Sequence, residues 1–143
     1  TYGLNQSKAG RGAQDFLKKS FNDNAKKFAD LEKALKKEES DLLSQKNILS
    51  KGDYTKKSDA LRKKVIDYQS QRRSSLDKIA TQRAESRKIL LQKISPIVDS
   101  YIKENNISIV IDKKNMIGGL NEYDITKVIV EKLNKELPSL NLK

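Results

Sequence analysis

Five apolar residues in the first third of the chain are each separated by seven positions: Phe21, Phe28, Leu35, Leu42 and Leu49. A sevenfold repeat places its members on one narrow stripe of an α-helix, which is the seam of a coiled coil. Most of the residues around them are polar and rich in lysine, so the stripe can be buried only against another helix. The repeat therefore predicts a long helix that packs along one face.

The stretch "SKGDYT", residues 50–55, interrupts this pattern with the only glycine of the long helical region, Gly52. Glycine followed by aspartate is a turn signal and a common helix stop. Apolar positions resume at Leu61, Val65 and Tyr68, which predicts a second helix. Two long helices joined by a short turn are expected to lie antiparallel as a hairpin.

The charge balance limits the functions that such a chain can have. The sequence has 30 Lys or Arg against 19 Asp or Glu, a net charge of +11, and neither His nor Cys. Residues 33–93 alone carry a net +9, which favours polyanions, anionic membranes or acidic proteins as partners. Without His, Cys or a glycine-rich phosphate loop, we expect no enzyme activity, no metal and no other cofactor. No signal peptide and no membrane-spanning apolar run are visible in this chain.

A short block, "ISIVIDKKNMIGGL", differs from the rest of the sequence. Its alternating isoleucines predict a strand over 107–112 with one buried face, followed by a short turn at 113–115 and a return strand over 116–120. An amphipathic helix N-capped by Asp124 is expected to follow, with Ile125, Val128, Ile129 and Leu133 on its apolar face. Since two strands and one helix cannot form a stable domain alone, this block predicts oligomerisation. The residues expected to form the association surface are Ile107, Ile109, Val110, Ile111, Met116, Ile117 and Leu120.

These patterns predict a mainly α protein with a small β association domain. Residues 1–20 and 105–143 are assigned to the association domain, and residues 21–104 to a helical-hairpin arm with its turn near 50–55. Because Arg72, Arg83 and Arg87 occupy or border seam positions of the second helix, we expect the hairpin to be marginal in stability and flexible.

Three short motifs resemble those of a known family. Ser7, Ala9 and Gly10 fit a Ser-x-Ala-Gly helix start, Val110–Asp112 fit a hydrophobic-hydrophobic-Asp strand, and Asp124–Thr126 fit an Asp-Ile-Thr helix start. In this order around a lysine-rich hairpin, they are similar to the Skp/OmpH family of periplasmic chaperones. Two departures stand out: the sequence starts after the position of the family's first strand, and Gly118–Gly119 stand where an aromatic residue is common.

The resemblance implies a homotrimer with a small β-barrel-like body and three helical tentacles, located in the periplasm of a Gram-negative bacterium. Such proteins hold unfolded outer-membrane β-barrel proteins in a cavity between the arms without ATP. Anionic lipid or lipopolysaccharide surfaces are further candidate partners. The candidate client-binding residues are Lys36, Lys37, Leu43, Ile48, Leu49, Tyr54, Lys56, Lys57, Leu61, Arg62, Lys63, Lys64, Arg72 and Arg73.

Two other classes of function remain open from the residues. A basic nucleic-acid-binding, nucleoid-like protein would explain the +11 charge, which binds DNA at low salt whatever the biological role. However, no recognition module is visible, and Tyr54 and Tyr68 do not form a base-stacking platform, so we expect such binding to be incidental. A structural coiled-coil scaffold would bind folded partners and ignore unfolded ones. For the arm residues, a solvated surface and simple hairpin packing are the plainer interpretations.

Overall fold

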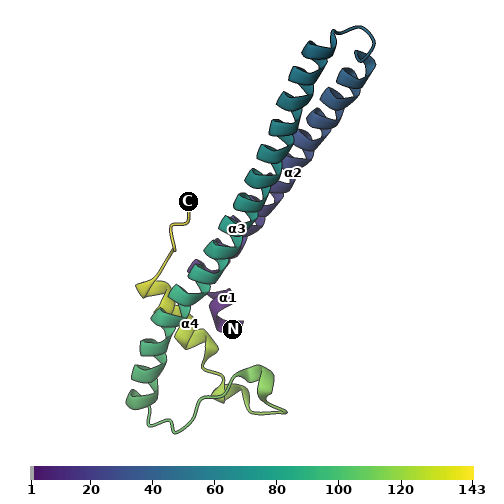
Figure 1. The fold of residues 1–143 in the computed structure, drawn as a ribbon. Helices are drawn as coiled ribbons and strands as arrows, with labels where there is room; N and C mark the ends of the chain where they lie inside the picture. The colour runs from purple at the N-terminus through teal and green to yellow at the C-terminus, as the bar shows by residue number, and fades with distance from the viewer. Residues whose placement is uncertain (1) are drawn as a thin grey trace. The chain divides into compact units, whose positions relative to one another are not determined.

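The computed structural model describes residues 2–143, with side chains from Gly3 onward (Figure 1). Its elements are α1 (Tyr2–Gln6), α2 (Lys8–Ser44), α3 (Lys51–Glu104), the 3-10 turns η1 (Lys113–Asn115) and η2 (Asn121–Tyr123), and α4 (Thr126–Glu136). The chain divides into two compact units. The first combines Thr1–Leu17 with Gln82–Lys143, and the second is Lys18–Thr81. The prediction of a mainly α protein is confirmed.

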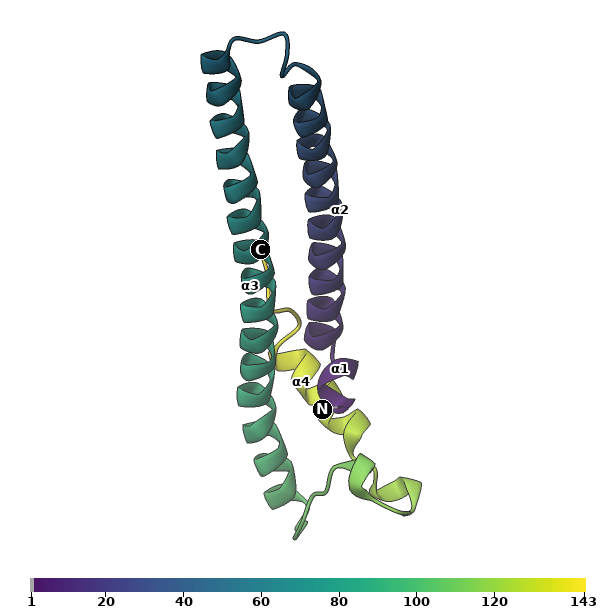
Figure 2. The ribbon, with the colours of Figure 1, turned by 45° about the vertical axis from the view of Figure 1, so that its right-hand side comes forward.

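The second unit is the predicted helical hairpin, and both views show its two helices side by side with the connection at one end (Figures 1 and 2). Phe28 and Leu42 of α2 are buried, as are Leu61 and Ile79 of α3. Two further members of the sevenfold repeat are half-buried, whereas Phe21 is 50% exposed. The periodicity therefore identifies the seam correctly except at its first position.

A buried polar contact interrupts the apolar seam of the hairpin. Asn24 is only 9% exposed, and its side chain forms a hydrogen bond with the hydroxyl of Ser75 across the two helices. Closer to the turn, the Lys64 ammonium donates to Glu38 at 2.7 Å. A buried polar pair contributes less to stability than an apolar one, but it disfavours other registers of the two helices. The Asn24–Ser75 contact thus fixes one register of the two helices, although an apolar pair there would stabilise the hairpin more.

The connection between α2 and α3 lies at residues 45–50, ahead of the predicted 50–55 stretch. Ser50 caps the second helix, because its hydroxyl oxygen accepts a hydrogen bond from the Asp53 N–H at 3.2 Å. The helix therefore begins at Lys51, and Gly52 lies inside its first turn. The serine cap outweighs the turn preference of the Gly-Asp pair, since a capped helix start accommodates glycine at little cost.

The core of the first unit joins four segments that are far apart in the sequence. α1 packs against α4, and both contribute to the same apolar cluster as α2 and α3. Its buried members are Leu4, Ala9, Leu90, Ile97, Ile129 and Leu133. Around them pack the half-buried side chains of Ile94, Val98, Tyr101, Ile125, Leu137 and Leu140. Helix α3 passes through Pro96 within this unit without a break in its assigned helical conformation.

The Ser-x-Ala-Gly motif is the start of α2. The Ser7 hydroxyl oxygen accepts a hydrogen bond from the Gly10 N–H at 3.0 Å, and the hydroxyl donates to the Leu4 carbonyl at 2.7 Å. The Lys8 N–H donates to the side-chain oxygen of Asn134 in α4 at 2.7 Å. These contacts satisfy N–H groups that every helix start leaves without an intrahelical partner. One motif therefore fastens α1, α2 and α4 together.

The predicted strands at 107–112 and 116–120 are wrong for the single chain, because no β-strand is assigned within residues 2–143. Only the short turn between them is confirmed, as η1. Ile109 and Ile111 are exposed rather than buried. A strand needs a neighbour for its N–H and C=O groups, and the single chain offers none here. The β-barrel-like body is therefore absent from the described part of this chain.

The fold predicts opposite effects for one substitution at two nearby glycines. A Cβ at position 10 would overlap the carbonyl oxygen of Leu4, whereas a Cβ at position 12 meets nothing within 4 Å. We expect Gly10→Ala to destabilise the protein by about 1–3 kcal/mol through overpacking. Gly12→Ala should instead stabilise it by about 0.5–1 kcal/mol through better helix propensity. Urea unfolding followed by circular dichroism measures both, and equal effects would contradict the close packing at Gly10.

Candidate functional site: the hairpin surface and the apolar segment

The apolar residues predicted to contact a partner near the hairpin turn differ in their exposure. Ile48 is 81% exposed and Leu43 is 58% exposed, so both are accessible on the hairpin surface. Leu49 and Tyr54 are half-buried. Leu61 is only 8% exposed and packs in the seam. The structure thus separates two accessible apolar side chains from one that holds the hairpin together.

An open groove of about 610 Å³ runs over this part of the hairpin. Apolar and charged side chains both line it. The apolar ones are Leu35, Leu42, Leu43, Tyr54, Leu61, Val65 and Tyr68, and the charged ones are Glu32, Lys36, Glu39, Arg62 and Arg72. An open groove with mixed apolar and charged lining differs from the enclosed, mostly apolar pocket that is typical of a small-ligand site.

Every basic residue predicted for partner binding is exposed on the hairpin. Four of them also form ion pairs with carboxylates. These pairs are Lys36–Glu32 at 3.0 Å, Lys37–Asp41 at 3.0 Å, Arg62–Asp59 at 3.7 Å and Lys64–Glu38 at 2.7 Å. Exposed pairs contribute little to stability and exchange readily with other partners. The lysine and arginine side chains can therefore reorient toward an incoming anionic group.

One carboxylate sits at a junction of aromatic and basic side chains in the hairpin. Glu32 accepts hydrogen bonds from Lys36 and, at 3.4 Å, from the hydroxyl of Tyr68. The bond from Lys36 is the main cause that lowers the pKa of Glu32, so this carboxyl group is charged at neutral pH. The Tyr68 ring in turn packs edge-to-face on Phe28, with ring centroids 5.8 Å apart. The contact orients Tyr68 beside the groove.

The second surface is the apolar segment, residues 107–123, in the first unit. Its side chains point largely into solvent although the sequence predicts a buried face for them. Among its apolar side chains, Ile107 is half-buried, and the exposed ones are Ile109, Val110, Ile111, Met116, Ile117, Leu120 and Tyr123. Exposed apolar side chains gathered in this way mark an interaction surface. Tyr123 was not predicted as part of it, although it follows the apolar block directly.

The apolar segment borders an open groove of about 910 Å³ within the first unit. Val98 and Tyr101 of α3 and Ile129 and Val130 of α4 line its other side. Of the predicted apolar face of α4, Ile129 is buried, and Val130 takes the buried position that was expected for Val128. The groove therefore joins the exposed segment to the apolar core of the unit.

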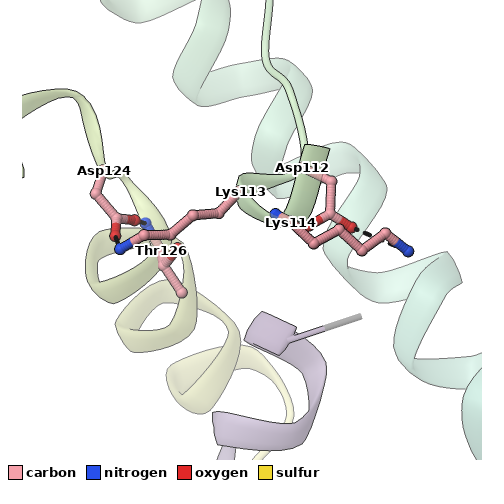
Figure 3. A network of polar contacts seen from close by, with 5 residues as sticks. All are labelled: Asp112, Lys113, Lys114, Asp124 and Thr126. Atoms are coloured by element: carbon pink, nitrogen blue, oxygen red, sulfur yellow. Dashed lines mark hydrogen bonds and ion pairs between the residues drawn. The ribbon is translucent and has the colours of Figure 1, made fainter. Parts of the chain in front are cut away.

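Polar contacts hold the two turns of the apolar segment (Figure 3). The Lys113 ammonium lies 2.7 Å from Asp124, whose other oxygen accepts the Thr126 N–H at 3.0 Å. These hydrogen bonds, the one from Lys113 foremost, lower the pKa of Asp124 well below its usual range. Asp112 accepts the Lys114 N–H at 3.3 Å and caps η1. The N-cap of α4 is Ile125, one residue after the predicted Asp124, but the Asp124 carboxylate accepts the first N–H of the helix.

Neither a metal centre nor a membrane span is found among the residues that the structure describes. No group of three or more His, Cys, Asp or Glu side chains is placed to hold a metal ion. No helix in the same part of the chain is long and apolar enough to cross a bilayer.

The arrangement of these elements matches known proteins. The sequence fits the family of OmpH-like outer membrane proteins over residues 2–133. This chain belongs to the OmpH-like family. A Skp-like protein of Pseudomonas aeruginosa is 26% identical over 117 residues, which cover 82% of this chain and 70% of that protein. A proposed outer membrane chaperone (OmpH-like) from Caulobacter crescentus has the same fold, with a TM-score of 0.87 at 15% identity over 99% of this chain and 84% of that one.

Membership of the OmpH-like family confirms the resemblance inferred from the three motifs. The structure shows what two of them do: Ser7 and Gly10 form the start of α2, and Asp124 fastens the start of α4. Asn134 was missed, since its contact with Lys8 joins residues 126 positions apart. No local sequence pattern predicts such a contact.

The different exposures of Leu61 and Leu43 predict that replacement with Ala destabilises the hairpin at position 61 but not at position 43. Leu61→Ala should destabilise the hairpin by about 2–5 kcal/mol, because it leaves a cavity in the seam. Leu43→Ala should change the free energy of unfolding by less than about 0.5 kcal/mol. Urea unfolding followed by circular dichroism measures both, and an equally large loss for Leu43→Ala would show that this side chain is part of the packed hairpin.

Proposed function

We propose that this chain is a holdase chaperone of the Gram-negative periplasm. It binds unfolded outer-membrane β-barrel proteins in a cavity between the helical arms of a homotrimer and keeps them from aggregating without ATP. The observation that carries the proposal is a basic hairpin with accessible apolar side chains near its turn, in a chain of the OmpH-like family. The Skp-like name of the Pseudomonas relative and the proposed chaperone role of the Caulobacter protein support it.

The hairpin surface has the properties that holding requires. A holdase lowers the free concentration of an unfolded protein by mass action, for which many weak contacts suffice. Ile48 and Leu43 offer apolar contact, and the exposed lysines around them offer contact to acidic groups. Neither kind of contact requires nucleotide, metal or a catalytic residue, so we expect a binding protein and not an enzyme.

The apolar segment supports self-association. Residues 107–111 carry a strand pattern, yet a single chain provides no neighbouring strand. Pairing of this segment with the same segment of other subunits would give its backbone N–H and C=O groups hydrogen-bond partners and bury the exposed isoleucines. We therefore propose that the β association body forms between subunits, as a trimer, with residues 1–20 and 105–143 in the body and residues 21–104 in the arm.

The net charge of +11 extends the range of partners beyond proteins. Anionic lipid and lipopolysaccharide surfaces would attract the exposed lysines, as would nucleic acid at low salt. We propose the first two as secondary partners and nucleic acid as an incidental one.

Replacing Ile109 and Ile111 together with Asp tests the association. Both side chains are exposed in the single chain, so the fold should tolerate the change, whereas a subunit interface would bury two uncompensated charges. We expect monomers with native helicity by sedimentation velocity and circular dichroism. A double variant that sediments like the wild-type oligomer would show that the interface lies elsewhere.

The wild-type chain should suppress aggregation of a urea-diluted β-barrel protein equally with and without ATP, as measured by light scattering.

Replacing Lys56, Lys57, Arg62 and Lys63 with Glu should slow capture, because exposed charges mainly speed encounter with acidic clients. Stopped-flow association of a labelled client across a salt series measures this effect. We expect the wild-type rate to fall with added salt and the variant rate to lose that dependence.

The matched control makes the same charge change outside the hairpin. Arg11, Lys127, Lys135 and Lys143 are exposed residues of the first unit that lie outside the proposed arm, and their replacement with Glu should slow capture much less. Equal slowing by both variants would mean that net charge alone attracts the client. Wild-type protein that leaves aggregation unchanged would reject the proposed function.

A further inference from the structure

We propose that the Lys113–Asp124 ion pair is a clip that preorganises the apolar segment for association with a second copy of this chain. The inference rests on the proposed self-association and names residues that set its affinity. Neither side chain is apolar, so neither was predicted as part of the association surface.

The position of the pair explains the term clip. Lys113 is the first residue of η1, and Asp124 directly follows η2. The two residues lie eleven positions apart, and their 2.7 Å contact closes the loop that carries Met116, Ile117 and Leu120. Figure 3 shows the Lys113 side chain extending from η1 to the carboxylate of Asp124, next to the start of α4.

Asp124 also connects the clip to the folded core. One of its oxygens accepts the Thr126 N–H, the first of α4, while the other faces Lys113. Ile129 and Leu133 bury α4 in the core of the first unit. The Lys113 end of the loop is thus tied to α4 through the Asp124 carboxylate.

The other end of the apolar segment is set by the backbone at the end of α3. Asn106 has a left-handed φ of 53°, and the Ile107 N–H donates to the Ile102 carbonyl at 3.0 Å. This is the usual way to end a helix such as α3 and to set the direction of the departing chain. The segment therefore leaves α3 in a defined direction and is held again at Lys113 and Asp124.

Holding the loop in this way matters more for association than for folding. Ordering a flexible loop costs conformational entropy, and a loop that is already closed loses less of it on binding. The clip itself is exposed, with 64% of the Lys113 side chain and 32% of the Asp124 side chain accessible. Such pairs contribute little to the stability of a fold. We therefore expect its loss to weaken the oligomer while the subunit remains folded.

Two single substitutions separate the clip from the helix cap. Lys113→Gln removes the cation and leaves the Asp124 contact with Thr126 intact. Asp124→Asn removes the charge but keeps a side-chain oxygen that can accept the same N–H. Because both break the same contact, their effects should not add in the double variant. Lys114→Gln is the matched control, since Lys114 pairs only at 3.7 Å and with Asp112, two positions away.

Sedimentation equilibrium of the full chain over a concentration series measures the effect. We expect a roughly three- to tenfold weaker association for each single variant, no further loss in the double variant, and no change for Lys114→Gln. Circular dichroism of the same variants in the monomeric Ile109→Asp, Ile111→Asp background should show unchanged helicity and unfolding midpoints. If the variants lose as much free energy of unfolding in this monomeric background as they lose in association, the pair only stabilises the subunit and the clip is rejected.

The outcomes distinguish the clip from the function on which it rests. If the wild type associates and the clip variants associate equally or more tightly, the clip is rejected and the proposed association stands. If the effects of the two substitutions add fully, they act through different contacts, and the clip is rejected as well. A wild type that remains monomeric at every concentration overturns the proposed self-association and, with it, the clip.

Discussion

The contacts at the start of α2 hold the first unit together, and its other elements depend on them. Ser7 and Asn134 supply side-chain oxygens to backbone N–H groups that the helix cannot satisfy itself. Because one oxygen comes from the preceding turn and the other from α4, capping this helix also joins segments that are 126 positions apart. Gly10 permits the close approach, since any side chain there would meet the Leu4 carbonyl.

The hairpin is governed by a different balance. Its seam is apolar at Phe28, Leu42, Leu61 and Ile79, but polar where Asn24 meets Ser75. This arrangement fixes the register of two helices whose remaining surface is charged and solvated, at some cost in stability. The fixed register keeps the exposed side chains of the hairpin, among them Leu43 and Ile48, at set positions along its surface.

The sequence predicts features that depend on neighbours along the chain and misses those that depend on distant ones. The sevenfold repeat is sufficient for the hairpin helices, since helix periodicity is local. The Gly52–Asp53 signal places the turn a few residues late, because the Ser50 cap starts the second helix at Lys51. Asn134 could not have been found, because its role arises only when α4 folds back on α2. The candidate hairpin residues were predicted as a group, but only the structure separates accessible Leu43 from buried Leu61.

The failed strand prediction points toward assembly. The alternation of Ile107, Ile109 and Ile111 is a β pattern, and the single chain leaves two of these side chains in solvent. Such a β-strand pattern without a neighbouring strand in its own chain is expected where the strand pairs with another chain. On this view the exposed isoleucines, the fixed exit from α3 and the Lys113–Asp124 contact have one cause. Under the proposed self-association, the exit from α3 and the ion pair hold the exposed isoleucines in the conformation that a second subunit would complete.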